Sequence, residues 1–178
     1  MKNKKNKLKG RKDNSVTKSL RVAVPLIILL SAAAAFAQTD AQKAYRILQT
    51  MPGTWEGTAE GKPLQVTFKE TAGGSAILSE ILGPEDMITM FHFDGPDRLL
   101  MTHYCAAGNQ PRLRASLSPD GKVLTFDFVD ATNLASPDAG HMQRVVFTLL
   151  DANHHVEEWT FLDHGKEIKR SFDLRRKG

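Results

Sequence analysis

The stretch from Met101 to Leu113, MTHYCAAGNQPRL, holds the most varied chemistry of the chain. An imidazole, a phenol and the only cysteine follow one another at His103, Tyr104 and Cys105, and a turn-forming Gly-Asn-Gln-Pro run comes next. A thiol beside an imidazole can serve a nucleophilic enzyme or a metal site. Polar groups at the end of a strand can instead serve a binding cavity. The spacing of these residues helps to separate the three interpretations.

A thiolate and base pair of Cys105 and His103 is disfavoured by strand geometry. Residues two apart in one strand share a face but lie about 6 to 7 Å from each other along the chain. That distance is too long for the direct hydrogen bond that activates a nucleophile. A lone cysteine at the end of an apolar strand usually packs as a small hydrophobic side chain. We therefore expect no catalytic residue here, while an enzyme that pairs Cys105 with another histidine remains an alternative.

The six histidines form no compact metal signature such as H-E-x-x-H. His154 and His155 are adjacent and lie beside turn-forming residues, so we expect a solvated turn there, and another at His164. His103 and His141 lie near strand ends beside polar loops. They are the better candidates for a metal or haem ligand, against a structural hydrogen-bonding role. The sequence predicts no metal site, and no cofactor is expected.

The elements that must position these groups are mainly strands, because apolar, β-branched and aromatic residues alternate with polar ones between turn signals. A short helix over 40–50, with Asp40 as its candidate N-cap, precedes them. The connections are mostly tight, which favours antiparallel neighbours, since a parallel crossover needs a dozen or more residues. Closing the meander into an up-and-down barrel removes exposed sheet edges, so an all-β antiparallel barrel is predicted. About ten strands are expected, over 54–59, 64–70, 76–82, 87–93, 98–105, 112–118, 123–129, 142–150, 156–162 and 168–175.

Alternation along the strands also predicts which side chains face inward. Arg112 and Arg114 share one face, which is either solvated or directed inward as a pair that could grip a carboxylate or phosphate. Asp127 is expected outside the barrel or paired with an arginine of a neighbouring strand. The expected core or cavity wall consists of Phe91, Phe93, Met101, Phe126, Phe128, Phe147 and Trp159.

Residues 1–37 have the pattern of a bacterial secretion signal, with a basic segment, an apolar run and small residues at Ala35 and Ala37. Cleavage before Gln38 is expected to leave one domain over 38–178 in the periplasm or outside the cell, with an uncleaved anchor as the alternative. The leader holds nine of the 24 Lys and Arg and one of the 20 Asp and Glu, which leaves 15 basic and 19 acidic residues. This balance indicates no nucleic-acid partner, and no membrane partner is expected after cleavage.

The first expected strand opens with GTWEG, directly after the helix. This resembles the G-x-W signature with which lipocalins and other calycin barrels begin, where the tryptophan plugs the closed end. Gly53, Trp55 and Gly57 together are similar to the opening of ten-stranded nitrobindin-like barrels. From GTWEG through FDFVDATNLASPDAGHM the chain resembles an uncharacterised family of exported bacterial calycin-like proteins, which implies a fold and a compartment but no activity. Nitrobindin-like barrels bind haem through a histidine of their closing strands, and EIKRSFDLRR contains none, so haem would require a substitute such as His141.

The polar turn after Cys105 and the long loop over 130–140 are expected to meet at one mouth of the barrel. Barrel mouths commonly hold apolar pockets with a few placed polar groups, so the predicted function is binding of a small, partly apolar ligand. The alternatives are a haem or metal barrel with redox or isomerase activity, a cysteine–histidine enzyme, and a protein-interaction module with a filled barrel. Polar side chains near the mouth could instead satisfy loop backbone groups. The expected ligand-binding residues are His103, Tyr104, Asn109, Gln110, Arg112, Asn133 and His141.

Overall fold

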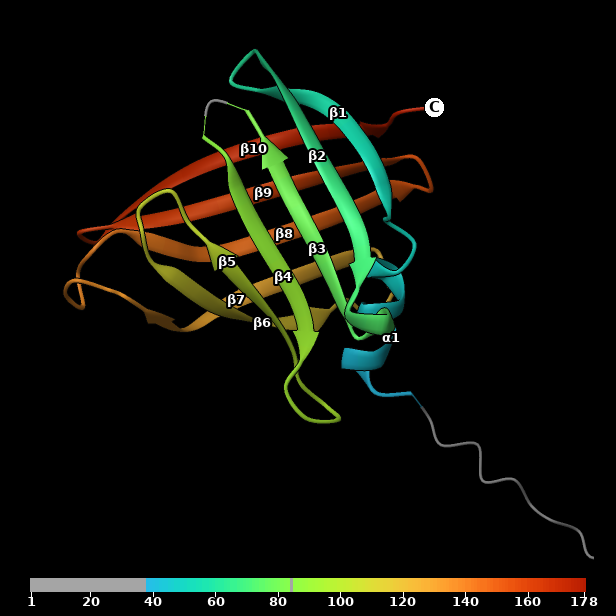
Figure 1. Ribbon diagram of the computed structural model, residues 1–178, viewed down its shortest axis with the longest axis horizontal. Coiled ribbons are helices and arrows are strands. Elements are labelled where there is room, and N and C mark those ends of the chain that lie inside the picture. Colours follow the sequence, from blue (N-terminus) through green and yellow to red (C-terminus); the bar gives the residue numbers. More distant parts are fainter. Residues whose placement is uncertain (1–37, 84) are drawn as a thin grey trace, which may run out of the picture. The chain divides into compact units, whose positions relative to one another are not determined.

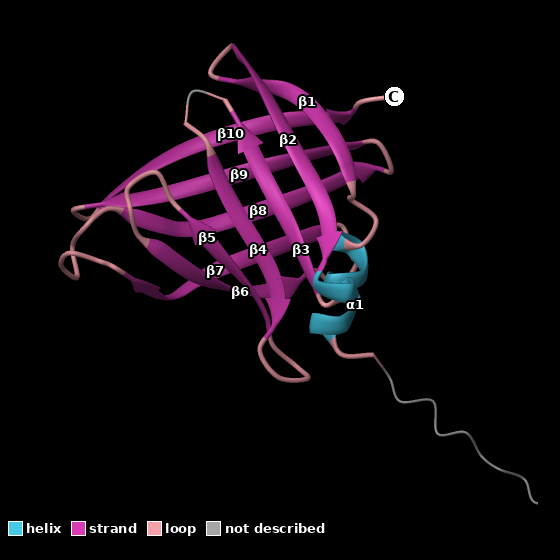
Figure 2. Cartoon of the chain, in the orientation of Figure 1, coloured by secondary structure: helices cyan, strands magenta, loops and turns pink. Residues whose placement is uncertain are grey.

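The computed structural model describes residues 38–83 and 85–178, so the expected secretion signal over 1–37 lies outside the described residues. The described part forms ten antiparallel strands that close into one barrel in chain order, with β1 paired to β10, as Figure 1 and Figure 2 show. No helix within this part is long and apolar enough to cross a membrane. The elements are α1 (Asp40–Leu48), β1 (Gly53–Ala59), β2 (Lys62–Thr71), the 3-10 turn η1 (Ala72–Gly74), β3 (Ala76–Leu82), β4 (Met87–Phe93), β5 (Leu99–Tyr104), β6 (Gln110–Leu117), β7 (Val123–Thr132), β8 (His141–Asp151), β9 (His154–Asp163) and β10 (Lys166–Arg176).

The prediction of an antiparallel barrel with a short N-terminal helix is confirmed, but the helix cap was assigned one residue late. Thr39 is the N-cap: its hydroxyl accepts from the Gln42 amide N–H at 3.2 Å, and the Gln42 side chain accepts from the Thr39 N–H at 3.1 Å. Asp40 lies in the first turn, where a carboxylate interacts favourably with the helix dipole. The Thr-x-x-Gln capping box therefore starts α1.

The prediction of a solvated turn at His154 and His155 is wrong, because both residues begin β9. The connection from β8 is only two residues long, which brings the histidines into the ladder with β10. Successive strand residues point to opposite faces. His154 lies on the outer side, 2.9 Å from Asp173 Oδ1, whereas His155 faces the interior and is 1 % exposed.

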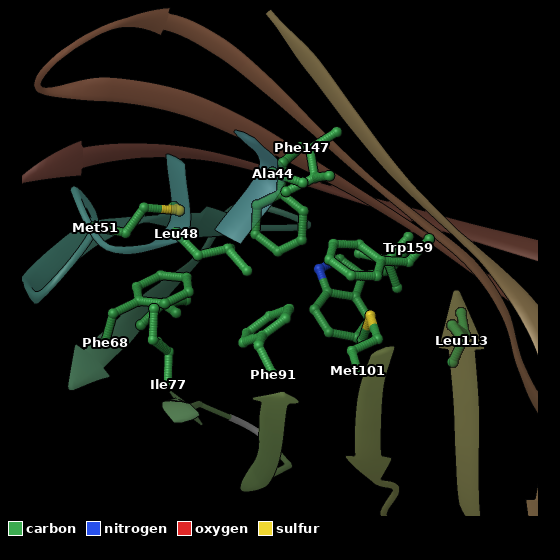
Figure 3. Packing of buried hydrophobic residues seen from close by; sticks show 14 of the residues in the cluster. Ala44, Leu48, Met51, Phe68, Ile77, Phe91, Met101, Leu113, Phe147 and Trp159 are labelled. Atoms are coloured by element: carbon green, nitrogen blue, oxygen red, sulfur yellow. The ribbon is translucent and has the colours of Figure 1, made fainter. Parts of the chain in front are cut away.

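Helix α1 and the start of β1 seal one end of the barrel. Ala44 and Leu48 on α1 and Met51 after it are buried against the inner face (Figure 3). Trp55 is 2 % exposed, its indole N–H donates to the Met51 carbonyl at 2.9 Å, and the Arg176 guanidinium lies 4.2 Å above its ring. This arrangement keeps the polar edge of the indole satisfied while its apolar area is buried.

Gly57 is required where β1 approaches β10. A Cβ atom added there would lie 2.0 Å from the Asp173 carbonyl oxygen, a backbone atom that cannot rotate away. Glycine at this position thus permits the pairing that closes the barrel.

Aromatic rings fill the middle of the barrel. The rings of Phe91, Phe126 and Phe147 lie 5.4 to 6.0 Å apart between centroids, and Phe68 lies 6.4 Å from Phe91. The predicted core is confirmed for five residues, which are buried, whereas Phe93 and Phe128 are only partly covered. The buried members of the prediction are Phe91, Met101, Phe126, Phe147 and Trp159.

The charged residues of β6 and β7 lie on the outer surface. Arg112 donates through Nε to Asp130 Oδ1 at 2.6 Å, and Arg114 is exposed. Asp127 accepts from Arg144 Nε of the neighbouring strand at 2.6 Å, which confirms the prediction of a cross-strand pair with an arginine. The interior cationic pair considered for Arg112 and Arg114 is therefore not formed.

Candidate ligand-binding cavity

The barrel is hollowed at the end opposite α1. The helix packs where β4 finishes, since the ring of Tyr45 lies 4.9 Å from that of Phe93, whereas Met87 at the start of β4 lines a cavity of about 340 Å³. A volume of this order lies in the range of small-ligand pockets. The wall is mainly apolar, formed by Met87, Met142, Trp159, Phe161, Ile168 and Phe172. These side chains come from β4, β8, β9 and β10, so closure of the sheet is what assembles the cavity.

Arg170 is the cationic residue at the rim of this cavity. Its guanidinium lies 3.6 Å from carboxylate oxygens of both Glu60 and Glu85. A second hollow of about 240 Å³ adjoins the first and shares Glu85, Met87, Arg170 and Phe172 with it. The ion pairs are long and solvated, so they hold Arg170 only weakly. The rim can therefore offer a guanidinium to a polar group on a bound molecule.

Polar groups form the layer beneath the cavity. His103 on β5 is completely buried, and its Nδ1 lies 2.9 Å from the Thr89 hydroxyl on β4. Its ring lies 5.0 Å from that of Trp159, which lines the cavity. Burial lowers the pKa of His103 to about 4, because an apolar environment disfavours the imidazolium ion. At neutral pH the ring is uncharged.

A second group of polar side chains, the polar row, runs from Trp159 through Glu157 to His155 toward the closed end of the barrel. The Trp159 indole N–H donates to Glu157 Oε2 at 2.9 Å, and Glu157 Oε1 lies 3.0 Å from His155 Nε2. Both Glu157 and His155 are 1 % exposed. The ring of His155 lies 4.3 Å from that of Trp55, so this row connects the cavity wall to the sealed end of the barrel.

The environment of Cys105 does not favour a nucleophilic thiolate. The residue lines the cavity, and burial raises the pKa of its thiol, while a hydrogen bond from the Ala107 backbone lowers it and the charge of Glu85 raises it further. Activated cysteines require the opposite shift. The Nδ1 atom of His103 is paired with the Thr89 hydroxyl and not with the Cys105 thiol.

The turn after β5 and the loop between β7 and β8 meet, as expected from the sequence. Asn109 Nδ2 donates to the Gly140 carbonyl at 2.7 Å, and Asn133 Nδ2 donates to the Gly108 carbonyl at 2.7 Å. Gln110 donates to the same Gly108 carbonyl at 3.2 Å. These amides satisfy backbone carbonyls and tie the two loops together. Ligand contact by any of them stays a prediction.

The remaining predicted site residues lie apart from the cavity wall. Tyr104 is exposed on the outer face, beside Ile88 of β4. Arg112 is engaged by Asp130, also outside. His141 is buried, with Nδ1 2.8 Å from the Ala139 carbonyl. His103 is the predicted residue in the layer beneath the cavity.

The sequence reasoning missed several cavity residues because it concentrated on one stretch. Trp159 was expected only in the core or cavity wall, and Phe172, Ile168 and Arg170 were not considered. A usable signal existed, since residues 168, 170 and 172 alternate on one face of the last strand. The end of the barrel at which they lie follows only from the observed pairing of β10 with β9.

The last strand, β10, lacks the histidine through which the nitrobindin-like resemblance implies haem binding. His141 cannot substitute without losing existing bonds, because its Nδ1 is held by Ala139 and its Nε2 lies 3.2 Å from Gln143 Oε1. Across residues 38–83 and 85–178, no group of three or more His, Cys, Asp or Glu side chains is placed to hold a metal ion. We derive no chemistry through a haem or a metal.

Comparison with known proteins gives support for the fold. No protein-family model and no curated protein matches the chain. Among solved structures, Rv2717c from M. tuberculosis is similar with a TM-score of 0.52 and 14 % identity, over 76 % of this chain and 98 % of that one. A protein of unknown function from the DUF3598 family of Nostoc punctiforme has a TM-score of 0.51 and 7 % identity. That match covers 74 % of this chain but only 49 % of the Nostoc protein.

Proposed function

We propose that this chain is an exported, calycin-like barrel that binds a small, mostly apolar ligand in the cavity opposite α1. The observation that carries the proposal is an apolar cavity of about 340 Å³ at one end of a barrel whose other end is sealed by α1 and Trp55. The G-x-W opening supports the calycin-like assignment. The similar solved structures support the fold alone.

The wall chemistry favours an apolar ligand body. Aromatic and thioether side chains, including Trp159, Phe172 and Met142, gain dispersion contacts and lose water when an apolar molecule enters. Each Å² of apolar surface removed from water contributes roughly 25 cal/mol before the costs of association. Arg170 at the rim suits a polar or anionic group at the outer end of the ligand.

Filling the cavity mouth tests this function. Purified protein should bind the uncharged fluorophore N-phenyl-1-naphthylamine saturably, with one site per chain. Ile168→Trp should weaken this binding at least about tenfold, because Ile168 lines the cavity and the larger side chain occupies its space. Fluorescence titration provides the measurement.

Lys169→Trp is the matched control, since Lys169 is exposed and points to the opposite face of β10. It should leave the affinity unchanged. Cys105→Ser should also retain the fluorophore, which separates a binding cavity from a thiol-dependent site. Equal affinities for Ile168→Trp and Lys169→Trp, or no saturable binding at all, would contradict the proposal.

Export makes a separate prediction. Small residues at 35 and 37 suit a signal peptidase, so mature protein should begin at Gln38. Intact-mass measurement on periplasmic material from a bacterial host checks this. Recovery of the full 178-residue chain from the membrane fraction would favour the uncleaved anchor.

A further inference from the structure

His103 carries a buried nitrogen that no protein group satisfies. The side chain is 0 % exposed, and Nε2 has no hydrogen-bond partner within residues 38–83 and 85–178. Buried polar atoms in folded proteins are nearly always hydrogen-bonded, and leaving one unpaired is unfavourable. The unpaired atom therefore indicates a partner that comes from outside the chain.

The position of His103 points to the cavity as the source of that partner. On β5 it lies two residues before Cys105, and its partner Thr89 on β4 lies two residues after Met87. Cys105 and Met87 line the cavity, so His103 and Thr89 occupy the next inward positions, directly beneath lining residues. Trp159, whose ring packs against His103, also lines the cavity.

We propose that His103 Nε2–H donates a hydrogen bond to a neutral acceptor oxygen at the inner end of the bound ligand. The inference rests on the proposed function and specifies the ligand class: a compact apolar molecule with a carbonyl-type oxygen, such as a ketone, aldehyde, quinone or ester.

The contact with Thr89 allows Nε2 to be a donor. When the Thr89 hydroxyl donates to Nδ1, the ring proton lies on Nε2. The reverse arrangement turns the hydroxyl proton away from the ring and leaves a bare lone pair at Nε2. The first arrangement leaves the pair with one unsatisfied donor, at Nε2, in the layer beneath the cavity.

The uncharged state of His103 selects a neutral group. With a pKa of about 4, the imidazole carries no positive charge at neutral pH and cannot balance a buried carboxylate. Arg170, the cation among the residues that line this cavity, lies at the rim. A carbonyl oxygen accepts one hydrogen bond at the inner end of the cavity without introducing a charge there.

His155 has an unpaired nitrogen too, Nδ1, but its surroundings differ. The rings of Trp55, Phe68 and Phe147 pack around it at the sealed end, with centroids 4.3 to 6.2 Å away. Neither histidine lines a hollow directly, but the ring that packs on His103 belongs to the lining residue Trp159, whereas none of the rings around His155 lines either hollow. His103 is therefore the histidine that lies directly behind the cavity wall.

A pair of probes of similar size tests the inference. 2-Acetylnaphthalene carries a carbonyl oxygen, and 2-ethylnaphthalene carries no hydrogen-bonding group. The unaltered protein should bind the acetyl compound about tenfold more tightly, the equivalent of one hydrogen bond that also satisfies a buried donor. The double variant Thr89→Val with His103→Phe removes both polar partners together, so neither is left unpaired. In that variant the preference should vanish while the ethyl compound still binds.

Equal affinity of both probes for the unaltered protein would overturn the inference and leave the apolar binding function intact. Saturable binding of neither probe would overturn both. Nitrogen-15 NMR of the unaltered protein gives an answer that does not depend on the folding of any variant. The Nε2–H proton signal of His103 should move with 2-acetylnaphthalene and stay in place with 2-ethylnaphthalene, and an unmoved signal with both refutes the contact.

Discussion

Glu157→Leu is expected to lower the free energy of unfolding by roughly 2 to 5 kcal/mol. Glu157 accepts from the Trp159 indole N–H at 2.9 Å and lies 3.0 Å from His155 Nε2, in a site that is 1 % exposed. Leucine would leave both nitrogens buried without a partner. The apolar gain from leucine offsets only part of that loss, because the two abandoned groups remain inside the barrel. Urea denaturation of the two proteins measures the difference.

Glu158→Leu is the matched control for this change. Glu158 is the next residue of β9 and is exposed on the outer face, so the same substitution there should change stability by only about 0.5 kcal/mol or less. Comparable losses for the two variants would show that Glu157 contributes nothing as a buried acceptor. A large loss confined to Glu157→Leu supports the polar row as a stabilising part of the interior.

Acidification from pH 6.5 to 4 is expected to remove about 3 kcal/mol of stability through His103 alone. Its pKa in the folded protein is about 4, against 6.5 for an ordinary histidine. Between pH 6.5 and pH 4 the unfolded chain binds a proton at His103 that the folded chain does not. Each unit by which the pH falls in this interval therefore lowers the free energy of unfolding. Above pH 6.5 the contribution is fully present, and below about pH 4 no further loss arises from this group.

The measurement is the pH dependence of urea unfolding for the unaltered protein and for Thr89→Val with His103→Phe. The double variant should lose stability less steeply over this interval, since it lacks the depressed histidine. Other titrating groups act in both proteins, so the difference between the two curves isolates His103. Parallel curves would mean that His103 is protonated inside the folded barrel.

The strands could be predicted from the sequence because each one shows a local pattern of residues. Residues 76–82 and 87–93 were predicted with the bounds that β3 and β4 have. The pattern along the strands also identified Phe91, Met101 and Phe126 correctly as interior residues. Turn residues gave the antiparallel order, since short connections cannot reach a parallel neighbour.

The positions that the sequence left open or assigned wrongly are those where a local pattern had two solutions. His154 and His155 follow Asp151 and Asn153, which favour a turn, yet a two-residue connection places both histidines in β9. Arg112 could face either side of its strand, and the bond to Asp130 on β7 places it outside. The decision depends on partners distant in sequence, which no window of residues contains.

By itself, the sequence determined an all-β antiparallel barrel, most of its interior residues, the glycine and tryptophan of β1, and the charge balance of residues 38–178. These follow from alternation, turn chemistry and composition, which neighbouring residues carry. Only the tertiary structure decided that His103 lies beneath a cavity formed with Trp159, Phe172 and Arg170. Strands β5, β9 and β10 meet there through the register and closure of the sheet. Whether a histidine is buried, and whether its second ring nitrogen finds a hydrogen-bond partner, depend on what surrounds the ring in space.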